Sequence, residues 1–229
     1  MRIAEIFHSI QGEGLLAGVP SIFIRTSGCN LRCHWCDTPY ASWKTEGPEM
    51  SVEEILKKLT EWKCDHVVLT GGEPMIAPDL PELATVLKKQ NTHITIETAG
   101  TILPNGIPCD LASLSPKLSN STPPPERDSA WAKKHESTRL QPEVISKWIR
   151  KYPFQLKFVV SSENDLVEIK SLLLNLPPVP FHQVLLMPEG VDTQTLATRS
   201  PWLVEICKRE GFRFCPRLHI ELFGHKRGT

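Results

Sequence analysis

Three cysteines stand close together in the stretch "CNLRCHWC", residues 29–36. Three residues separate Cys29 from Cys33, and two separate Cys33 from Cys36. Cysteine thiolates bind zinc ions and iron–sulfur clusters, and a closed zinc site or a cubane [4Fe–4S] cluster normally takes four protein ligands. Three thiolates from one tight loop would leave one iron of a cluster without a protein ligand. Such an iron is free to bind a substrate.

A structural zinc site is the alternative, and it needs a fourth ligand from elsewhere in the chain. The sequence has no second closely spaced cysteine pair to supply it. The single side chains that could do so are His34, Cys64, Cys109, Cys207, Cys215 and His219. We expect the four cysteines outside the motif to be packed as small hydrophobic residues and not to bind a metal. Three buried thiols that bind no metal are the remaining interpretation, which the compact spacing disfavours.

The composition favours thiolate chemistry in a reducing compartment. Seven cysteines are an odd number, which argues against a framework of disulfides. We find no secretory leader at the amino terminus and no apolar run of the ~18 residues that a membrane span needs, so we expect a cytoplasmic protein. Lys plus Arg equals Asp plus Glu at 26 each, which disfavours direct binding to nucleic acid or to an anionic membrane surface.

Short β-branched runs alternate with segments of helical period along the 229 residues. We expect strands at 3–7, 21–26, 66–70, 93–98, 111–115, 155–160, 183–187 and 213–222. We expect helices at 51–62, 79–90, 142–152, 163–174 and 200–211, the first opened by a capping box and the last with a proline in its first turn. This alternation predicts an α/β fold with a mostly parallel sheet, either open or curled into a partial barrel.

One domain, residues 1–229, is the expectation for a chain of this length. Residues 118–140, "LSNSTPPPERDSAWAKKHESTRL", show neither helical nor strand period, and we interpret them as a proline-rich insertion or mobile loop.

Distinctive loops follow four of the predicted strands. The cysteine loop follows 21–26, "GGEP" follows 66–70, "TAG" ends 93–98 and "SPK" follows 111–115. Because the carboxyl ends of parallel strands meet at one edge of a sheet, we expect the four loops to form one site.

The spacing CxxxCxxC after a barrel-type strand, with Trp35 just before the last cysteine, resembles the radical S-adenosylmethionine enzymes. The resemblance implies an incomplete, modified (β/α) barrel. It also implies that the open iron of a [4Fe–4S] cluster on Cys29, Cys33 and Cys36 binds the amino and carboxylate groups of S-adenosylmethionine. An electron from the cluster then cleaves the cofactor to a 5′-deoxyadenosyl radical.

The segments "IFHSIQGEG", "FIRTSGCNLRCHWCDT", "LTGGEP", "SPK" and "QLKFVV" together resemble the 7-carboxy-7-deazaguanine synthases, a family of the queuosine pathway. The family contracts the ring of 6-carboxy-5,6,7,8-tetrahydropterin with loss of ammonia. The resemblance implies Mg²⁺ as a further cofactor, a reductant such as flavodoxin or ferredoxin, and a homodimer. A radical enzyme of different specificity, such as an activase, and a zinc or electron-transfer protein are the rival functions.

The same resemblance assigns residues to each ligand. Those expected at the cofactor are Trp35, Cys36, Asp37, Gly72, Glu73, Thr98, Ser115, Pro116, Lys117, Gln155 and Lys157. Those expected at the pterin are Ile10, Gln11, Gly12, Glu13, Arg25, Thr70 and His219. Thr38 is expected to bind Mg²⁺, which takes hard oxygen ligands.

The chemistry of these side chains agrees with the assignment. A carboxylate such as Glu13 can accept two N–H groups from the edge of a reduced pterin, and an amide such as Gln11 can bind a neighbouring carbonyl. Arg25 could hold the substrate carboxylate. Structural interpretations stay open: a turn for "QGEG" and for "SPK", a helix cap for Thr38, an edge strand for 155–157, and a structural histidine for His219.

Overall fold

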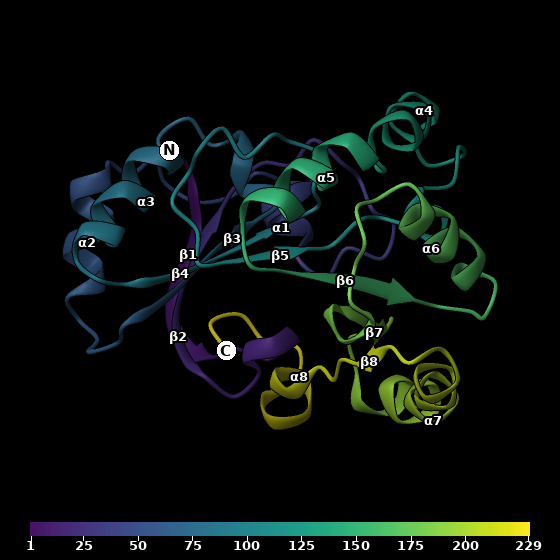
Figure 1. Ribbon diagram of the computed structural model, residues 1–229. Coiled ribbons are helices and arrows are strands. Elements are labelled where there is room, and N and C mark those ends of the chain that lie inside the picture. Colours follow the sequence, from purple (N-terminus) through teal and green to yellow (C-terminus); the bar gives the residue numbers. More distant parts are fainter.

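The computed structural model describes residues 1–229, which form one curved eight-stranded sheet with helices around its outside (Figure 1). The strands are β1 (Ile3–Ile10), β2 (Pro20–Thr26), β3 (His66–Gly71), β4 (His93–Thr98), β5 (Leu111–Leu114), β6 (Phe154–Val160), β7 (Val184–Pro188) and β8 (Arg213–Phe214). They lie in chain order across the sheet. β1 is antiparallel to β2, and all later neighbours are parallel. β8 does not pair with β1, so the predicted α/β fold with an incomplete barrel is confirmed.

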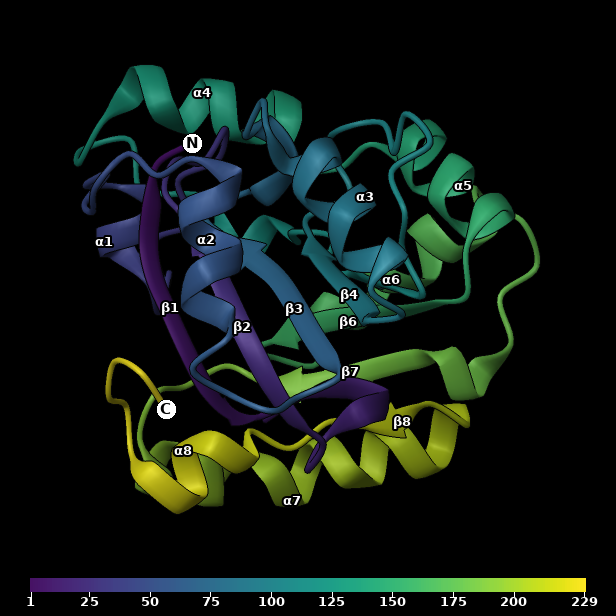
Figure 2. The same cartoon turned by 90° about the vertical axis from the view of Figure 1, so that its left-hand side faces the viewer.

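Helices cover the convex side of the sheet, as two views at right angles show (Figure 2). They are α2 (Val52–Leu59), α3 (Leu80–Lys89), α5 (Pro142–Lys151), α6 (Asp165–Leu174) and α7 (Thr193–Glu210). Three further helices, α1 (Pro39–Ser42), α4 (Ser129–Thr138) and α8 (Leu218–Phe223), contribute no residue to the core beneath this layer. The predicted capping box opens α2, where the Ser51 hydroxyl accepts from the Glu54 N–H and the Glu54 carboxylate accepts from the Ser51 N–H.

Alternation along the strands separates the core from the site. Side chains on the outer side of the sheet are apolar and pack with the helices in one core of 34 buried residues. It includes Leu69 of β3, Ile96 of β4 and Leu156 of β6. The inner side carries polar residues instead, among them Thr70, Glu97 and Lys157. Because successive strand side chains point to opposite faces, the same strands build both the core and a polar interior.

Two predictions near the carboxyl terminus are corrected: the helix expected at 200–211 is present but begins earlier, and most of the strand expected at 213–222 is not a strand. α7 begins at Thr193, because the Asp192 carboxylate caps it by accepting from the Thr195 N–H at 2.8 Å. Pro201 therefore lies within the helix and not in its first turn. The last strand covers only Arg213–Phe214, and Leu218–Phe223 is a helix. Pro216 explains the short strand, because proline has no N–H to donate to a sheet ladder.

Residues 118–140 contain regular structure that the sequence did not predict. A 3-10 turn covers Ser119–Ser121, and α4 follows, capped by Asp128 through the Trp131 N–H. The segment is attached through polar groups. His135 is fully buried, and its Nδ1 accepts from the Arg32 N–H of the cysteine loop at 3.0 Å.

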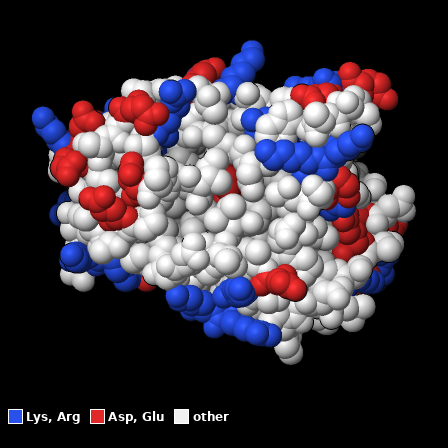
Figure 3. Space-filling model, turned by 90° about the horizontal axis from the view of Figure 1, so that it is seen from above, with Lys and Arg blue, Asp and Glu red and all other residues white.

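No helix has the length and apolar character needed to cross a membrane. Basic and acidic side chains both surround a largely uncharged central hollow on the face seen in Figure 3.

A buried histidine at the amino-terminal end of the sheet predicts a pH dependence of stability. His66 Nδ1 lies 2.6 Å from the Ser21 hydroxyl and Nε2 lies 2.9 Å from the Thr95 hydroxyl. Burial, together with the neighbouring His93, lowers the pKa of His66 to about 4. Since an unfolded histidine titrates near pH 6.5, the stability due to neutral His66 is complete above about pH 6.5 and is lost as the pH falls toward 4.

We therefore expect the unfolding free energy of His66→Asn to fall less between pH 7.5 and pH 5.5 than that of the wild type. Within that window each such histidine contributes a slope of up to about 1.4 kcal/mol per pH unit. Urea unfolding at pH 7.5, 6.5 and 5.5 measures the slope. The control His182→Asn removes an exposed histidine and should leave it unchanged. Equal slopes for wild type and His66→Asn would contradict the assignment.

Candidate active site

A cavity lies on the inner face of the sheet toward the carboxyl ends of the parallel strands. Most of the residues predicted at the site line it. They are Ile10, Gln11, Gly12, Glu13, Arg25, Cys29, Cys33, Trp35, Cys36, Asp37, Thr38, Thr70, Gly72, Thr98, Ser115, Lys117, Lys157 and His219. Three predicted residues, Glu73, Pro116 and Gln155, do not line the cavity.

The three cysteines of the motif face this cavity from the loop after β2. Burial raises the pKa of Cys29 and of Cys33 to about 12, so these thiols need a bound cation to become thiolates. No group of three or more His, Cys, Asp or Glu side chains is closed around a single metal ion. Cys215 accepts instead from the Gly14 N–H at 3.1 Å. Three cysteines on one loop beside an open cavity fit a cluster with one exposed iron better than a closed zinc site.

The cysteine loop packs tightly against the glycine loop. A Cβ added to Gly72 would lie 2.2 Å from Gly28 O and 2.8 Å from Cys29 Cβ. The Glu73 N–H donates to Gly28 O at 2.9 Å. Glycine at position 72 therefore lets two backbone segments meet directly beside the first cysteine of the motif.

Glu73 holds a third loop in place. Its carboxylate accepts from the Thr98 hydroxyl at 2.8 Å and from the N–H groups of Ala99 and Met75 at 2.9 and 3.1 Å. Burial raises its pKa, and these hydrogen bonds oppose the rise. Glu73 thus joins the "GGEP" and "ETAG" loops, and its carboxylate is fully buried behind the cavity wall instead of facing the cavity.

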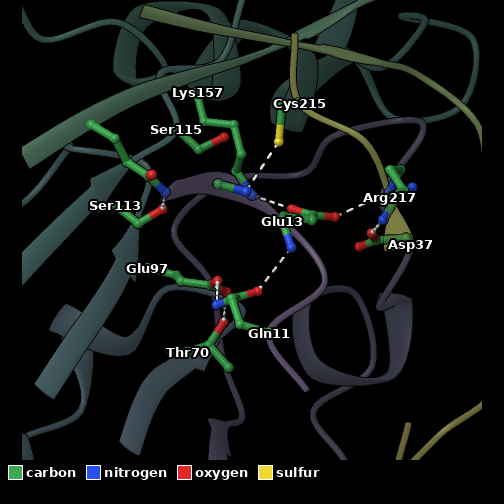
Figure 4. Close-up of polar contacts among 12 residues, drawn as sticks. Gln11, Glu13, Asp37, Thr70, Glu97, Ser113, Ser115, Lys157, Cys215 and Arg217 are labelled. Carbon is green, nitrogen blue, oxygen red and sulfur yellow. Dashed lines mark hydrogen bonds and ion pairs between the residues drawn. The ribbon is translucent and has the colours of Figure 1, made fainter. Parts of the chain in front are cut away.

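Four charged side chains form an ion-pair network on the opposite wall (Figure 4), in which Arg217, Lys157 and Glu13 are largely shielded from water and Asp37 is partly exposed. Glu13 accepts from Lys157 with one oxygen and from Arg217 Nε with the other, and Arg217 also donates to Asp37. Burial alone would raise the pKa of Glu13, but Lys157 and Arg217 hold it well below its usual range. Glu13 is therefore a carboxylate at neutral pH.

An uncharged amide lies next to a second acid in the cavity (Figure 4). Gln11 Nε2 donates to Glu97 Oε1 at 3.1 Å, and the Thr70 hydroxyl donates to Glu97 Oε2 at 2.9 Å. The Gln11 side-chain oxygen accepts from the Glu13 N–H at 3.1 Å. These bonds fix the direction of the amide and present alternating donors and acceptors to the cavity.

Arg25 of β2 projects beside a flat apolar surface. Phe7 and Phe23 stack with ring centroids 4.9 Å apart and planes 6° apart. Arg25 Nε lies 3.3 Å from a Glu5 oxygen but makes no hydrogen bond, although it is buried. The guanidinium thus retains donors for an anionic ligand.

Lys117, Ser115 and Trp35 form the wall nearest the cysteine loop. Lys117 Nζ donates to the Ser115 hydroxyl at 2.8 Å and lies 5.7 Å from the centre of the Trp35 ring. Trp35 Nε1 donates to Asn120 O at 2.9 Å. A cation, a hydroxyl and an aromatic face together fit a ligand with a carboxylate and a planar ring.

Other predicted residues have structural partners. Gln155 accepts from the Leu15 N–H at 2.7 Å and donates to the Ser113 hydroxyl at 2.7 Å. The His219 ring lies so close to Gly12 that an added Cβ would be 2.0 Å from Nδ1, and burial lowers the pKa of His219. Thr38 precedes α1 but makes no capping bond, and its hydroxyl is 3.8 Å from Cys36 Sγ.

Four charged residues that line the cavity were not predicted: Glu5, Glu97, Arg217 and Lys226. The alternation within "HITIET" could have placed Glu97 on the inner face, because an ionisable residue in an apolar strand rarely lies in a core. Arg217 gave no local signal, since it lies 204 positions from its partner Glu13.

Residues 23–114 match the profile of the Radical SAM superfamily. The 7-carboxy-7-deazaguanine synthase of Rhodopirellula baltica is 46% identical over 230 residues, covering 100% of this chain and 89% of that protein. The one of Halobacterium salinarum is 42% identical over 233 residues, covering 97% and 90%. The crystal structure of QueE from Escherichia coli superposes with a TM-score of 0.71 at 26% identity, covering 95% and 94% of the two chains.

The packing at Gly72 predicts a steric effect on cluster binding. We expect Gly72→Ala to lose most of its iron after anaerobic reconstitution, because the new methyl group would collide with Gly28 O and displace the cysteine loop. Val167→Ala is the control, since Val167 of α6 is 74% exposed and does not line the cavity. Iron and sulfide analysis gives the result, and full cluster content in Gly72→Ala would refute the steric argument.

Proposed function

Because the chain belongs to the family of 7-carboxy-7-deazaguanine synthases, radical S-adenosylmethionine enzymes of 7-deazapurine biosynthesis, we propose that it converts 6-carboxy-5,6,7,8-tetrahydropterin into 7-carboxy-7-deazaguanine. Ammonia is the second product, and substrate minus ammonia equals product, so the conversion has no net oxidation or reduction. The main support is one cavity that holds the three-cysteine loop together with Gln11, Glu13 and Glu97.

The cofactors have matching residues on one side of the cavity. Cys29, Cys33 and Cys36 would hold the cluster, whose bound S-adenosylmethionine supplies the 5′-deoxyadenosyl radical. Lys117 and Ser115 can bind the cofactor carboxylate, since both are polar and face the cavity. Gly72 keeps the glycine loop against the cysteine loop, so that both lie at the same ligand.

The pterin edge has matching residues on the other side. Each oxygen of Glu13 accepts one bond from a cation, which leaves further lone pairs for N–H groups of the substrate. Lys157 and Arg217 keep Glu13 ionised and in a fixed position. The Gln11 amide, oriented by Glu97, can form hydrogen bonds with the neighbouring carbonyl and amine of the pterin. Thr70 is held by the same carboxylate.

The carboxylate of the substrate has a partner in Arg25, whose buried Nε makes no hydrogen bond. The stacked pair of Phe7 and Phe23 beneath it excludes water and gives a planar ring an apolar contact. The proposal places C6 of the pterin between these two groups of residues, where a hydrogen atom can be abstracted.

Mg²⁺ is a further part of the proposal. The Thr38 hydroxyl lines the cavity without capping α1, so an oxygen ligand is free beside the cysteine loop. One protein oxygen suits Mg²⁺, which usually keeps waters and substrate oxygens as its other ligands. The proposal also includes a flavodoxin or ferredoxin as electron donor and a homodimer as the working form.

Anaerobic turnover tests the function directly. The reconstituted enzyme is mixed with 6-carboxytetrahydropterin, S-adenosylmethionine, Mg²⁺ and dithionite, and mass spectrometry follows 7-carboxy-7-deazaguanine. We expect product in excess of enzyme. Cleavage of S-adenosylmethionine without any deazaguanine would refute the substrate and leave a radical enzyme of other specificity.

Removing the charge of Glu13 should impair substrate use. Glu13→Gln turns one acceptor into a donor and leaves Lys157 and Arg217 without their carboxylate, so we expect kcat/KM for the pterin to fall about 10- to 100-fold. Cluster content and S-adenosylmethionine affinity should persist. Glu189→Gln removes a carboxylate paired with Arg199 outside the cavity and serves as the control. Full pterin activity in Glu13→Gln would refute substrate binding by "QGEG" and favour the interpretation of this segment as a structural turn.

Thr38 provides a separate test of the metal. Thr38→Ala should retain the cluster and the cleavage of S-adenosylmethionine but lose stimulation of turnover by Mg²⁺, because the hydroxyl ligand is gone. Thr38→Ser keeps the hydroxyl and should respond as the wild type does. A Mg²⁺ titration of all three proteins measures the effect, and identical curves would remove Thr38 from the metal site.

A further inference from the structure

We propose that the outer surface over the cysteine loop is the docking site for an acidic one-electron carrier protein. This electron-entry surface consists of Arg32, Trp43, Arg127, Trp131 and Lys134. The inference rests on the proposed function, since radical formation requires a reduced cluster and the electron that reduces it has to come from a donor outside the chain. The carrier is oxidised by one electron, and the cluster receives it.

Cations and indole rings alternate across the electron-entry surface. The Arg32 guanidinium carbon lies 4.0 Å from the centre of the Trp131 ring and 6.0 Å from that of Trp43. Arg127 lies 3.8 Å from the Trp43 ring, and Lys134 Nζ lies 4.4 Å from the Trp131 ring. Trp43 follows α1, while Arg127, Trp131 and Lys134 belong to the segment 118–140. That segment thus gains a role that its sequence did not reveal.

Two members of the surface touch the backbone that carries the cysteines. Arg32 Nη1 donates to Cys29 O at 2.8 Å and to Leu31 O at 2.7 Å. Trp43 Nε1 donates to Cys33 O at 3.1 Å. Electron transfer slows steeply with distance, so a donor needs the shortest approach to the cluster. The cavity side is assigned to S-adenosylmethionine and the pterin, and the outer side of the loop is the approach that remains.

The charges on this surface are unbalanced. Arg32, Arg127 and Lys134 have no carboxylate partner within 4 Å, and neither do the exposed Lys44 and Lys133 nearby in the chain. The neighbouring acids are already engaged, Asp128 as the cap of α4 and Glu136 with Arg139. Only Glu126 has no such partner.

This chemistry fits an acidic redox protein. Trp and Arg are the side chains most enriched where a few residues carry the binding energy of an interface. Electron-transfer complexes have small interfaces and are transient. At low salt, opposite charges on the two partners raise the association rate by roughly 10- to 1,000-fold. Because the whole chain is neutral, such attraction has to come from a local group of cations like this one.

Charge reversal separates docking from chemistry. Arg127 and Lys134 touch neither the cysteine loop nor the cavity through any hydrogen bond, so Arg127→Glu/Lys134→Glu should leave dithionite-driven turnover unchanged. With reduced flavodoxin as donor at low ionic strength, we measure the slope of the turnover rate against flavodoxin concentration. We expect this apparent second-order rate constant to be about ten-fold or more lower in the variant than in the wild type. Added salt should slow the wild type toward the rate of the variant.

Lys63→Glu/Lys151→Glu is the matched control, because Lys63 precedes β3 and Lys151 precedes β6, at the opposite end of the sheet. It should behave as the wild type with both donors. Equal flavodoxin-driven rates in all three proteins would overturn the docking site. A change from dimer to monomer in the Arg127→Glu/Lys134→Glu variant, measured by sedimentation, would also overturn it and assign the surface to a second copy of the chain. Loss of turnover with dithionite in the wild type would instead refute the proposed function.

Discussion

The need to pair buried charges is the constraint on which this structure depends. The side chains of Arg217, Lys157 and Glu13 are only 6%, 8% and 13% exposed, and a charge so removed from water is costly unless an opposite charge meets it. Hydrogen bonds of the sheet do not join β1 to β8. Glu13, which follows β1, and Arg217, which follows β8, bridge that gap electrostatically. The segments that follow the first and last strands are thus joined where no strand pairing joins them, and the same contact keeps a carboxylate ionised inside the cavity.

The cysteine loop is held from two directions. On the inside the glycine loop presses against it at Gly72, and on the outside residues 118–140 bind it through Ser121 and His135. The His34 N–H donates to Ser121 O at 3.0 Å, and the Arg32 N–H donates to His135 Nδ1 at 3.0 Å. Three thiols on a loop fixed in this way are positioned before any ligand arrives, which reduces the ordering that binding must impose.

The sequence predicted the fold where periodicity was apolar and local. The strand pattern of 155–160 placed Lys157 on the inner face, but its partner Glu13 is 144 positions away, and no spacing announces a contact of that range. Helix α4 was missed because the residue that anchors it, His135, is polar, so the segment lacks an apolar stripe. Pro201 suggested a helix start, yet the cap at Asp192 and the packing of Leu196 and Leu203 outweigh one lost hydrogen bond.

The bridge from Glu13 to Arg217 also fixes an order of events during synthesis. A ribosome releases the cysteine loop long before residue 217, and contacts between distant positions form late because a long loop must close first. The carboxylate of Glu13 therefore gains its partner Arg217 only after nearly the whole chain has been made, so this part of the cavity wall is among the last to be completed.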